Sequence, residues 1–290
     1  MDLLYFNGNN FGDKLNPFLF FALFDRLSFI EAYPDHIILG LGSILSNAYF
    51  GVLPEGYKAI PFGSGVRQPD ITPPQGFAPG FVRGPVSSKY MGCDYIADTA
   101  YLFPLLKDYK KYTAAEKKYD LSVMPYFKHT NSIDWAHFER LTGVHVIDPT
   151  GPLLTVLDEI AASGHIVAGA MHGCIVADVF RIPWARLRFT THETEPLVQD
   201  VKWLDWTLSI NVADYPLFRM KTDNTFDQAS RDLLEKELTA LFSGQIDSAN
   251  FALSSEDTFN AIVSKLHGAV KDFSRQYSVS INKYRTNLPG

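Results

Sequence analysis

The chain has few cysteines, no long hydrophobic run and no excess of positive charge. Its two cysteines, Cys93 and Cys174, lie far apart and show no metal-ligand spacing, so we expect a reducing, cytoplasmic setting. The apolar stretch at 18–24 is far shorter than the roughly 20 residues that span a bilayer. The acidic start, Met1-Asp2, does not resemble a secretory leader.

Charge and motif content exclude several further classes of function. The formal net charge is −6, so no nucleic-acid partner is expected, because nucleic-acid binding normally needs a basic face. The chain has no P-loop, no Gly-x-Ser-x-Gly elbow and no metal-ligand spacing. Gly40-Leu41-Gly42 opens like a dinucleotide fingerprint but has Leu45 where the third glycine belongs. No metal and no cofactor are therefore expected.

Apolar strands alternate with helical segments along most of the 290 residues, which predicts an α/β fold with parallel sheets. A lysine-rich stretch at 105–119 marks the expected boundary between two Rossmann-like domains, 1–115 and 116–290, that face a cleft. The second domain is expected to end in closing helices near 224–243 and 255–275. The last of these has an apolar stripe at helical spacing that predicts packing on a core, namely Phe259, Ile262, Val263, Leu266, Val270 and Phe273. A helix containing Pro17 in its first turn is expected after the first strand.

The most informative single residue is His172, which stands where the strand HIVAGAM ends and a helix begins. Ligands of parallel sheets bind at the carboxyl ends of strands, and a helix N-terminus attracts anions. His172 is therefore a candidate general acid, and Gly173 would let a ligand approach the backbone. A structural histidine bonded to a carbonyl is the alternative.

Other polar groups also follow predicted strands. Asn10, Asp13 and Asn16 follow the first strand, and Asp13 could deprotonate a sugar hydroxyl, whereas Asn16 could simply cap a helix. Lys128 and His129 follow the strand VMPYF. Arg83 offers a planar fork for phosphate or carboxylate, with a surface ion pair as the alternative. Lys202 is a weaker candidate, and the helical spacing of Trp203 and Trp206 favours core positions.

A set of ordered segments covers residues 3 to about 210, namely NNFGDKLNP, IILGLGSIL, IPFGSGV, FVRGPVSSKYMG, DYIADTAYLFP, HVIDP, IAASGHIVAGAMHGCIVADVFRIPW and KWLDW. This order resembles that of the polysaccharide pyruvyl transferases, in particular the exopolysaccharide ketal-pyruvate transferases. The resemblance implies a GT-B-like fold and transfer of pyruvate from phosphoenolpyruvate, as donor substrate, to a sugar of an exo- or capsular polysaccharide precursor. A pyruvate ketal would form and phosphate would be released.

The resemblance also assigns roles to single residues. His172 matches the family's proposed catalytic acid, and Asp13 is the expected base. In some relatives an arginine two residues before this histidine binds the donor, whereas this chain has Ala170 there. We expect other groups to bind the donor, with Arg83 as first choice, followed by the set Lys128, His129, Gly173 and Arg67. Asn10 and Asn16 are expected on the acceptor side.

The first domain is then the expected acceptor side and the second the donor side. The acceptor would be a sugar or a lipid-linked oligosaccharide, which implies a cytoplasmic protein in peripheral contact with the inner membrane face. Two other functions fit the same fold, because a fold does not fix function. One is a GT-B glycosyltransferase that uses a nucleotide sugar, and the other is a non-catalytic sugar-binding relative.

Overall fold

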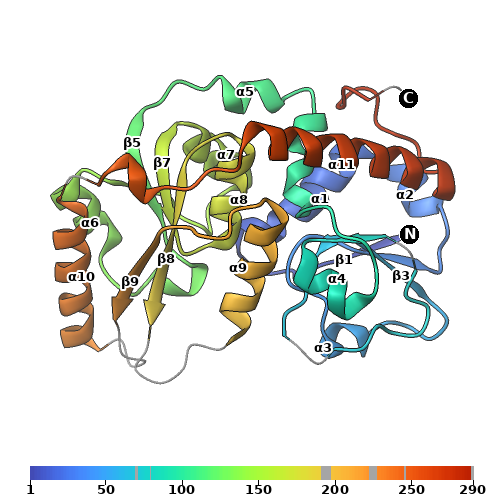
Figure 1. Cartoon of the computed structure of the whole chain (residues 1–290), viewed down its shortest axis with the longest axis horizontal. Helices are drawn as coiled ribbons and strands as arrows, with labels where there is room; N and C mark the ends of the chain where they lie inside the picture. Colours follow the sequence, from blue (N-terminus) through green and yellow to red (C-terminus); the bar gives the residue numbers. More distant parts are fainter. Residues whose placement is uncertain (69–70, 79, 191–196, 222–226, 245, 289–290) are drawn as a thin grey trace.

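Two parallel sheets organise the chain, of which the computed structural model describes residues 1–68, 71–78, 80–190, 197–221, 227–244 and 246–288 (Figure 1). The first sheet has the order β1 (Asp2–Leu4), β2 (His36–Leu39), β3 (Lys58–Ser64) and β4 (Phe81–Val82). The second has the order β6 (His145–Val146), β5 (Tyr119–Met124), β7 (Ser163–Ala168), β8 (Trp184–Thr190) and β9 (Leu217–Lys221). The predicted α/β class with parallel sheets is confirmed.

Helices surround both sheets. They are α1 (Phe11–Leu23), α2 (Arg26–Glu31), α3 (Asn47–Phe50), α4 (Pro85–Met91), α5 (Tyr109–Thr113), α6 (Trp135–Thr142), α7 (Leu153–Ala161), α8 (Met171–Val179), α9 (Leu197–Ser209), α10 (Gln228–Phe242) and α11 (Glu256–Tyr277), with 3-10 turns η1 (Thr99–Leu105), η2 (Phe127–His129) and η3 (Ser248–Asn250). The second sheet is covered on both faces, because Val167 of β7 packs in one core cluster and its neighbours Ile166 and Ala168 in another.

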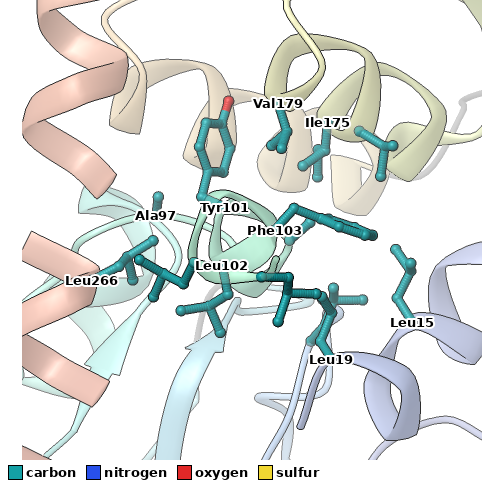
Figure 2. Close-up of a cluster of buried hydrophobic side chains, with 14 of the residues drawn as sticks. Leu15, Leu19, Ala97, Tyr101, Leu102, Phe103, Ile175, Val179 and Leu266 are labelled. Atoms are coloured by element: carbon teal, nitrogen blue, oxygen red, sulfur yellow. The ribbon is translucent and has the colours of Figure 1, made fainter. Parts of the chain in front are cut away.

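The turn η1 lies at the centre of the largest core cluster. Figure 2 shows Tyr101, Leu102 and Phe103 of η1 between side chains of α1, α8 and α11, with Leu15 on one side and Leu266 on another. All five are fully buried. Because α1 belongs to the first sheet's layer and α8 to the second's, one continuous core joins the two halves of the molecule.

The last helix, α11, crosses from the second sheet to the first (Figure 1). At its start Glu256 pairs with Arg181 at 2.9 Å, and near its end the ring of Phe273 lies 5.2 Å from that of Phe24 and 5.3 Å from that of Phe62. The expected closing helix thus packs partly on the predicted first domain. The division at residue 115 stays a prediction.

Two sequence-based expectations about packing are confirmed. The apolar stripe of α11 is buried at Phe259, Ile262, Leu266, Val270 and Phe273, and its sixth member, Val263, is half-buried against the same core. Trp203 and Trp206 of α9 are also buried, as core residues rather than as an exposed sugar platform. Their indole rings meet edge-on at 5.7 Å.

The expected position of Pro17 in the first turn of its helix is wrong, because α1 begins at Phe11 and Pro17 lies inside it. A proline inside a helix has no N–H for the carbonyl four residues earlier. Here that carbonyl belongs to Asp13, and the side chain of Asn16 donates to it at 3.3 Å. The same amide nitrogen donates to the carbonyl of Leu41 at 3.1 Å. Asn16 therefore compensates for the proline and ties α1 to the loop after β2.

This compensation can be tested with a double-mutant cycle. Asn16→Ala leaves two buried carbonyls without their donor and should lower the free energy of unfolding by about 2–4 kcal/mol. In a Pro17→Ala background the new N–H can bond the Asp13 carbonyl, so Asn16→Ala should cost about 1 kcal/mol less there. Urea unfolding measures both. An equal cost in the two backgrounds would contradict the compensation.

Candidate functional site

A pocket of about 390 Å³ lies where loops at the carboxyl ends of both sheets meet. The loops after β1, β2 and β3 line it from the first sheet, and those after β5 and β7 from the second, with Lys202 of α9. The second sheet's order reverses at this point, because β6 lies on one side of β5 and β7 on the other. Such a switch point leaves a crevice at the carboxyl ends of the strands, where ligands of open α/β sheets bind.

His172 lines this pocket in the first turn of α8. The helix is preceded by Ala170, which provides no side-chain cap, and within its first turn the N–H of Gly173 donates to the carbonyl of Ala170 at 2.9 Å. The partial positive charge of this helix N-terminus still favours an anion. The imidazole packs against α1, where a Cβ at Gly12 would overlap it. Its Nε2 lies 3.6 Å from Oδ2 of the buried Asp98. The lack of a side chain at Gly12 therefore allows the two helix N-termini to meet.

Asp13 lines the same pocket in the first turn of α1. Its carboxylate accepts a hydrogen bond of 3.0 Å from Nδ2 of Asn10, which also lines the pocket. Burial raises the pKa of Asp13 to about 6, and Asn10 and the positive charges of His172 and Lys202 offset part of that effect. A carboxylate with such a pKa accepts protons more readily near neutral pH than an exposed aspartate does.

Three cationic side chains line the pocket, namely Arg67, Lys128 and Lys202. Arg67 and Lys128 are exposed, whereas Lys202 is half-buried with its ammonium 5.5 Å from the centre of the Tyr126 ring. Asp13 provides the one carboxylate in the lining that the structure describes. With two helix N-termini added, the pocket is chemically suited to an anion.

Arg83, the first choice for donor binding, lies outside this pocket and is fully buried. Its Nε donates to Asp205 at 3.0 Å, and its Nη1 donates to the hydroxyl of Ser43 at 3.2 Å. Asp205 also accepts from the backbone N–H and the hydroxyl of Ser87. Arg83 thus contacts the pocket through Ser43, which lines it. The ion pair of Arg83 with Asp205 joins the first sheet's layer to α9.

Three other predicted site residues also lie outside the pocket lining. Asn16 is buried in α1 with the structural role given above. His129 stacks on Phe189 at 4.9 Å, and burial lowers its pKa to about 4, with the adjacent Lys128 contributing. At Gly173 a Cβ would lie 2.6 Å from the sulfur of Met124, so this glycine serves the packing of α8 on β5. The structure brings together His172, Asp13, Asn10, Lys128 and Arg67.

Asp98 and Lys202 are the site residues that sequence reasoning missed or ranked too low. Lys202 lies on a helix that follows β8, and only the packing of α9 beside the first sheet's layer brings it to the pocket. Asp98 precedes η1 and caps it, accepting from the N–H of Ala100 at 3.0 Å. An aspartate before a helical turn is recognisable in the sequence as a cap. The sequence does not reveal where the second carboxylate oxygen of that aspartate points.

The buried charge of Asp13 should make stability depend on pH. The folded-state pKa is raised, so between about pH 4 and 6 the unfolded chain ionises first and wild-type stability falls as pH rises. Asp13→Asn removes this loss. Its stability relative to wild type should therefore increase by up to about 3 kcal/mol from pH 4 to pH 8 in urea unfolding. An identical difference at both pH values would contradict a buried, charge-bearing Asp13.

The position of Arg83 predicts a structural role for this residue. Arg83→Met leaves Asp205 buried without its charge partner and should lower the free energy of unfolding by about 3–5 kcal/mol. Adding Asp205→Leu should recover much of that loss, because no unpaired charge then remains. Thermal and urea unfolding measure both variants. An Arg83→Met protein of wild-type stability would favour a ligand-binding arginine instead.

In the part of the chain that the structure describes, no helix is long and apolar enough to cross a membrane. A scan against protein-family models finds no match. The chain is similar to the succinoglycan biosynthesis protein ExoV of Rhizobium meliloti (strain 1021), at 32% identity over 213 residues. The aligned part is 71% of this chain and 63% of the relative, so it spans less than two thirds of that protein. The chain is thus similar to a protein of succinoglycan biosynthesis over most of its own length.

Proposed function

We propose that the protein transfers pyruvate from phosphoenolpyruvate to a sugar of an exo- or capsular polysaccharide precursor, forming a pyruvate ketal and releasing phosphate. One observation carries this proposal. The pocket combines an imidazole, a carboxylate of raised pKa, three cations and two helix N-termini without side-chain caps at the carboxyl ends of the two sheets. This composition suits a small donor that carries a phosphate and a carboxylate and needs both an acid and a base.

The donor carries a phosphate and a carboxylate, and both require positive partners. The first turn of α8 and the side chains of Lys202, Lys128 and Arg67 supply them in this proposal, in place of the arginine that some relatives have at the position of Ala170. Arg83 supports the pocket from behind through Ser43. The volume of about 390 Å³ is large enough for a donor of ten heavy atoms beside one sugar hydroxyl pair.

The reaction needs one proton donor and one proton acceptor in its first step. The imidazolium of His172 gives a proton to the methylene carbon, so that C2 becomes electrophilic. A sugar hydroxyl attacks C2, and Asp13 takes the hydroxyl's proton. The second sugar hydroxyl then attacks C2 as the bond between C2 and the phosphate oxygen breaks. The proton of this second hydroxyl leaves with the phosphate, and the ketal is complete. No cofactor or metal takes part in this scheme.

The proposal includes the finer architecture and the partners. The two halves would act as in a GT-B fold, with residues 1–115 on the acceptor side and 116–290 on the donor side. Asn10 would contact the acceptor sugar, which the relative's role in succinoglycan biosynthesis suggests is an exopolysaccharide unit. A lipid-linked acceptor would bring the protein to the inner face of the membrane as a cytoplasmic, peripheral enzyme.

Calorimetric titration with phosphoenolpyruvate tests the donor site without an acceptor. Wild type should bind saturably, and Lys202→Met should weaken binding roughly 10- to 100-fold, because a charge-assisted contact contributes about 1.5–3 kcal/mol. Lys110→Met is the matched control, since Lys110 is an exposed lysine of α5 that does not line the pocket. His172→Gln should retain binding but lower phosphate release with lipid-linked oligosaccharide by about 100-fold or more.

Nucleotide sugars and inorganic phosphate are titrated beside the donor. Saturable binding of a UDP- or GDP-sugar, with no response to phosphoenolpyruvate, would contradict the pyruvyl transferase and favour the glycosyltransferase on the same fold. Equal weakening by Lys202→Met and Lys110→Met would show that binding depends on overall charge rather than on the pocket.

A further inference from the structure

We propose that Asp98 is the positioning residue for His172, selecting the imidazole tautomer with its proton on Nε2 and leaving Nδ1 as the reactive nitrogen. The inference rests on the proposed function for the use of His172 as an acid. The tautomer itself follows from geometry alone.

The two nitrogens of His172 have different surroundings. Nε2 is buried and lies 3.6 Å from Oδ2 of Asp98, and neither atom has a hydrogen-bond partner among the described residues. Nδ1 lies over Gly12 in the first turn of α1, where a Cβ would overlap it. A separation of 3.6 Å is longer than a hydrogen bond, but catalytic contacts of this kind are often long without substrate and shorten when it binds.

Asp98 differs from the other fully buried aspartates in the described part of the chain. Asp178 accepts four hydrogen bonds, from Tyr101, Trp184 and twice from Ser254. Asp205 accepts three, from Arg83 and Ser87. Asp98 uses Oδ1 for the N–H of Ala100, whereas its Oδ2 has no hydrogen-bond partner among the described residues and lies 3.6 Å from Nε2 of His172.

An oxygen left unpaired inside a protein is costly, and each such case in a native structure needs an explanation. Capping η1 explains one oxygen of Asp98 and not the other. A proton on Nε2 of His172 would satisfy both orphan atoms at once. The pair of orphan atoms therefore points to a His–Asp contact that forms in the working site.

The position of Asp98 is fixed independently of His172. The next residue, Thr99, donates its hydroxyl to the carbonyl of Phe62 in β3. Gly63 has a φ of +79°, and a Cβ there would lie 2.7 Å from the N–H nitrogen of Thr99. Because β3 and η1 approach this closely, the carboxylate has little freedom to follow a moving histidine. A fixed carboxylate that holds an imidazole in one orientation and stabilises its protonated form is the role of the aspartate in catalytic triads.

The matched substitution is Asp98→Asn. Asparagine caps a helical turn as well as aspartate does, so the cap on Ala100 should survive. Its Nδ2 can only donate to His172, which forces the proton onto Nδ1, and it cannot stabilise an imidazolium. The control is Asp25→Asn, the same change at the cap of α2, where Asp25 accepts from Ser28 at 2.9 Å.

The readout is the two-bond ¹H–¹⁵N correlation spectrum of protein labelled at histidine, at a pH about two units above the ordinary histidine pKa. His172→Gln identifies the signal. We expect wild type and Asp25→Asn to show the Nε2–H form and Asp98→Asn the Nδ1–H form. With lipid-linked acceptor, kcat of Asp98→Asn should fall at least about tenfold while KM for phosphoenolpyruvate changes little.

The outcomes separate this inference from the proposed function. A tautomer switch in a protein that does not turn over phosphoenolpyruvate supports the role of Asp98 and rejects only the reaction. A wild-type Nδ1–H form, or one tautomer in both wild type and Asp98→Asn, overturns the inference whatever the activity. Should Asp98→Asn not fold, Asp98→Ser keeps a cap and removes Oδ2. It should give a mixture of tautomers, and a pure Nε2–H form would contradict the proposal.

Discussion

The contact between the first turns of α1 and α8 is the constraint on which the site depends. Gly12 lets the imidazole of His172 lie against α1, and the backbone of that turn is fastened to the second half of the molecule. The N–H of Phe11 donates to the carbonyl of Pro149 at 2.8 Å. The ammonium of Lys14 donates to the carbonyls of Thr150 and Gly151. A larger residue at position 12 would push the two helix N-termini apart and so move His172 away from Asp13, the acid and the base of the proposed reaction.

A second interaction also joins the two halves of the molecule near the pocket. The buried pair of Arg83 and Asp205 joins the first sheet's layer to α9, three residues from Lys202. Buried ion pairs contribute little net stability, but they impose one geometry, because any shift leaves a charge unpaired. In this chain the pair holds Ser43 and α9 in place, so that the cation of Lys202 reaches the pocket. Both sets of contacts, those of the first turn of α1 and the Arg83–Asp205 pair, lie at the junction of the two halves, where the donor and acceptor of the proposed reaction would have to meet.

Sequence reasoning reached the parts of the fold that local pattern determines. Continuous apolar strands and the helical stripe of α11 predicted the parallel sheets and the buried faces. His172 and Asp13 were identified because each follows a strand, and that position alone brings a residue to the carboxyl edge. The role of Arg83 was not predictable, because its partner Asp205 is 122 residues away. The same holds for Asp98, whose cap is local but whose second oxygen faces a residue of another layer. The start of α1 before Pro17 was missed because the side chain of Asn16 replaces the lost backbone donor.

The central claim is that one pocket between the two sheets holds a small anion with a phosphate and a carboxylate against His172. The most direct measurement is a crystal structure of the protein with phosphoenolpyruvate. The account predicts density at the first turn of α8, with the phosphate or carboxylate within hydrogen-bond distance of Lys202 and the methylene carbon next to the His172 ring. Density elsewhere, for example in the larger groove between α11 and the first sheet, would contradict it. An ordered but empty pocket in crystals grown at a saturating concentration of phosphoenolpyruvate would contradict it equally.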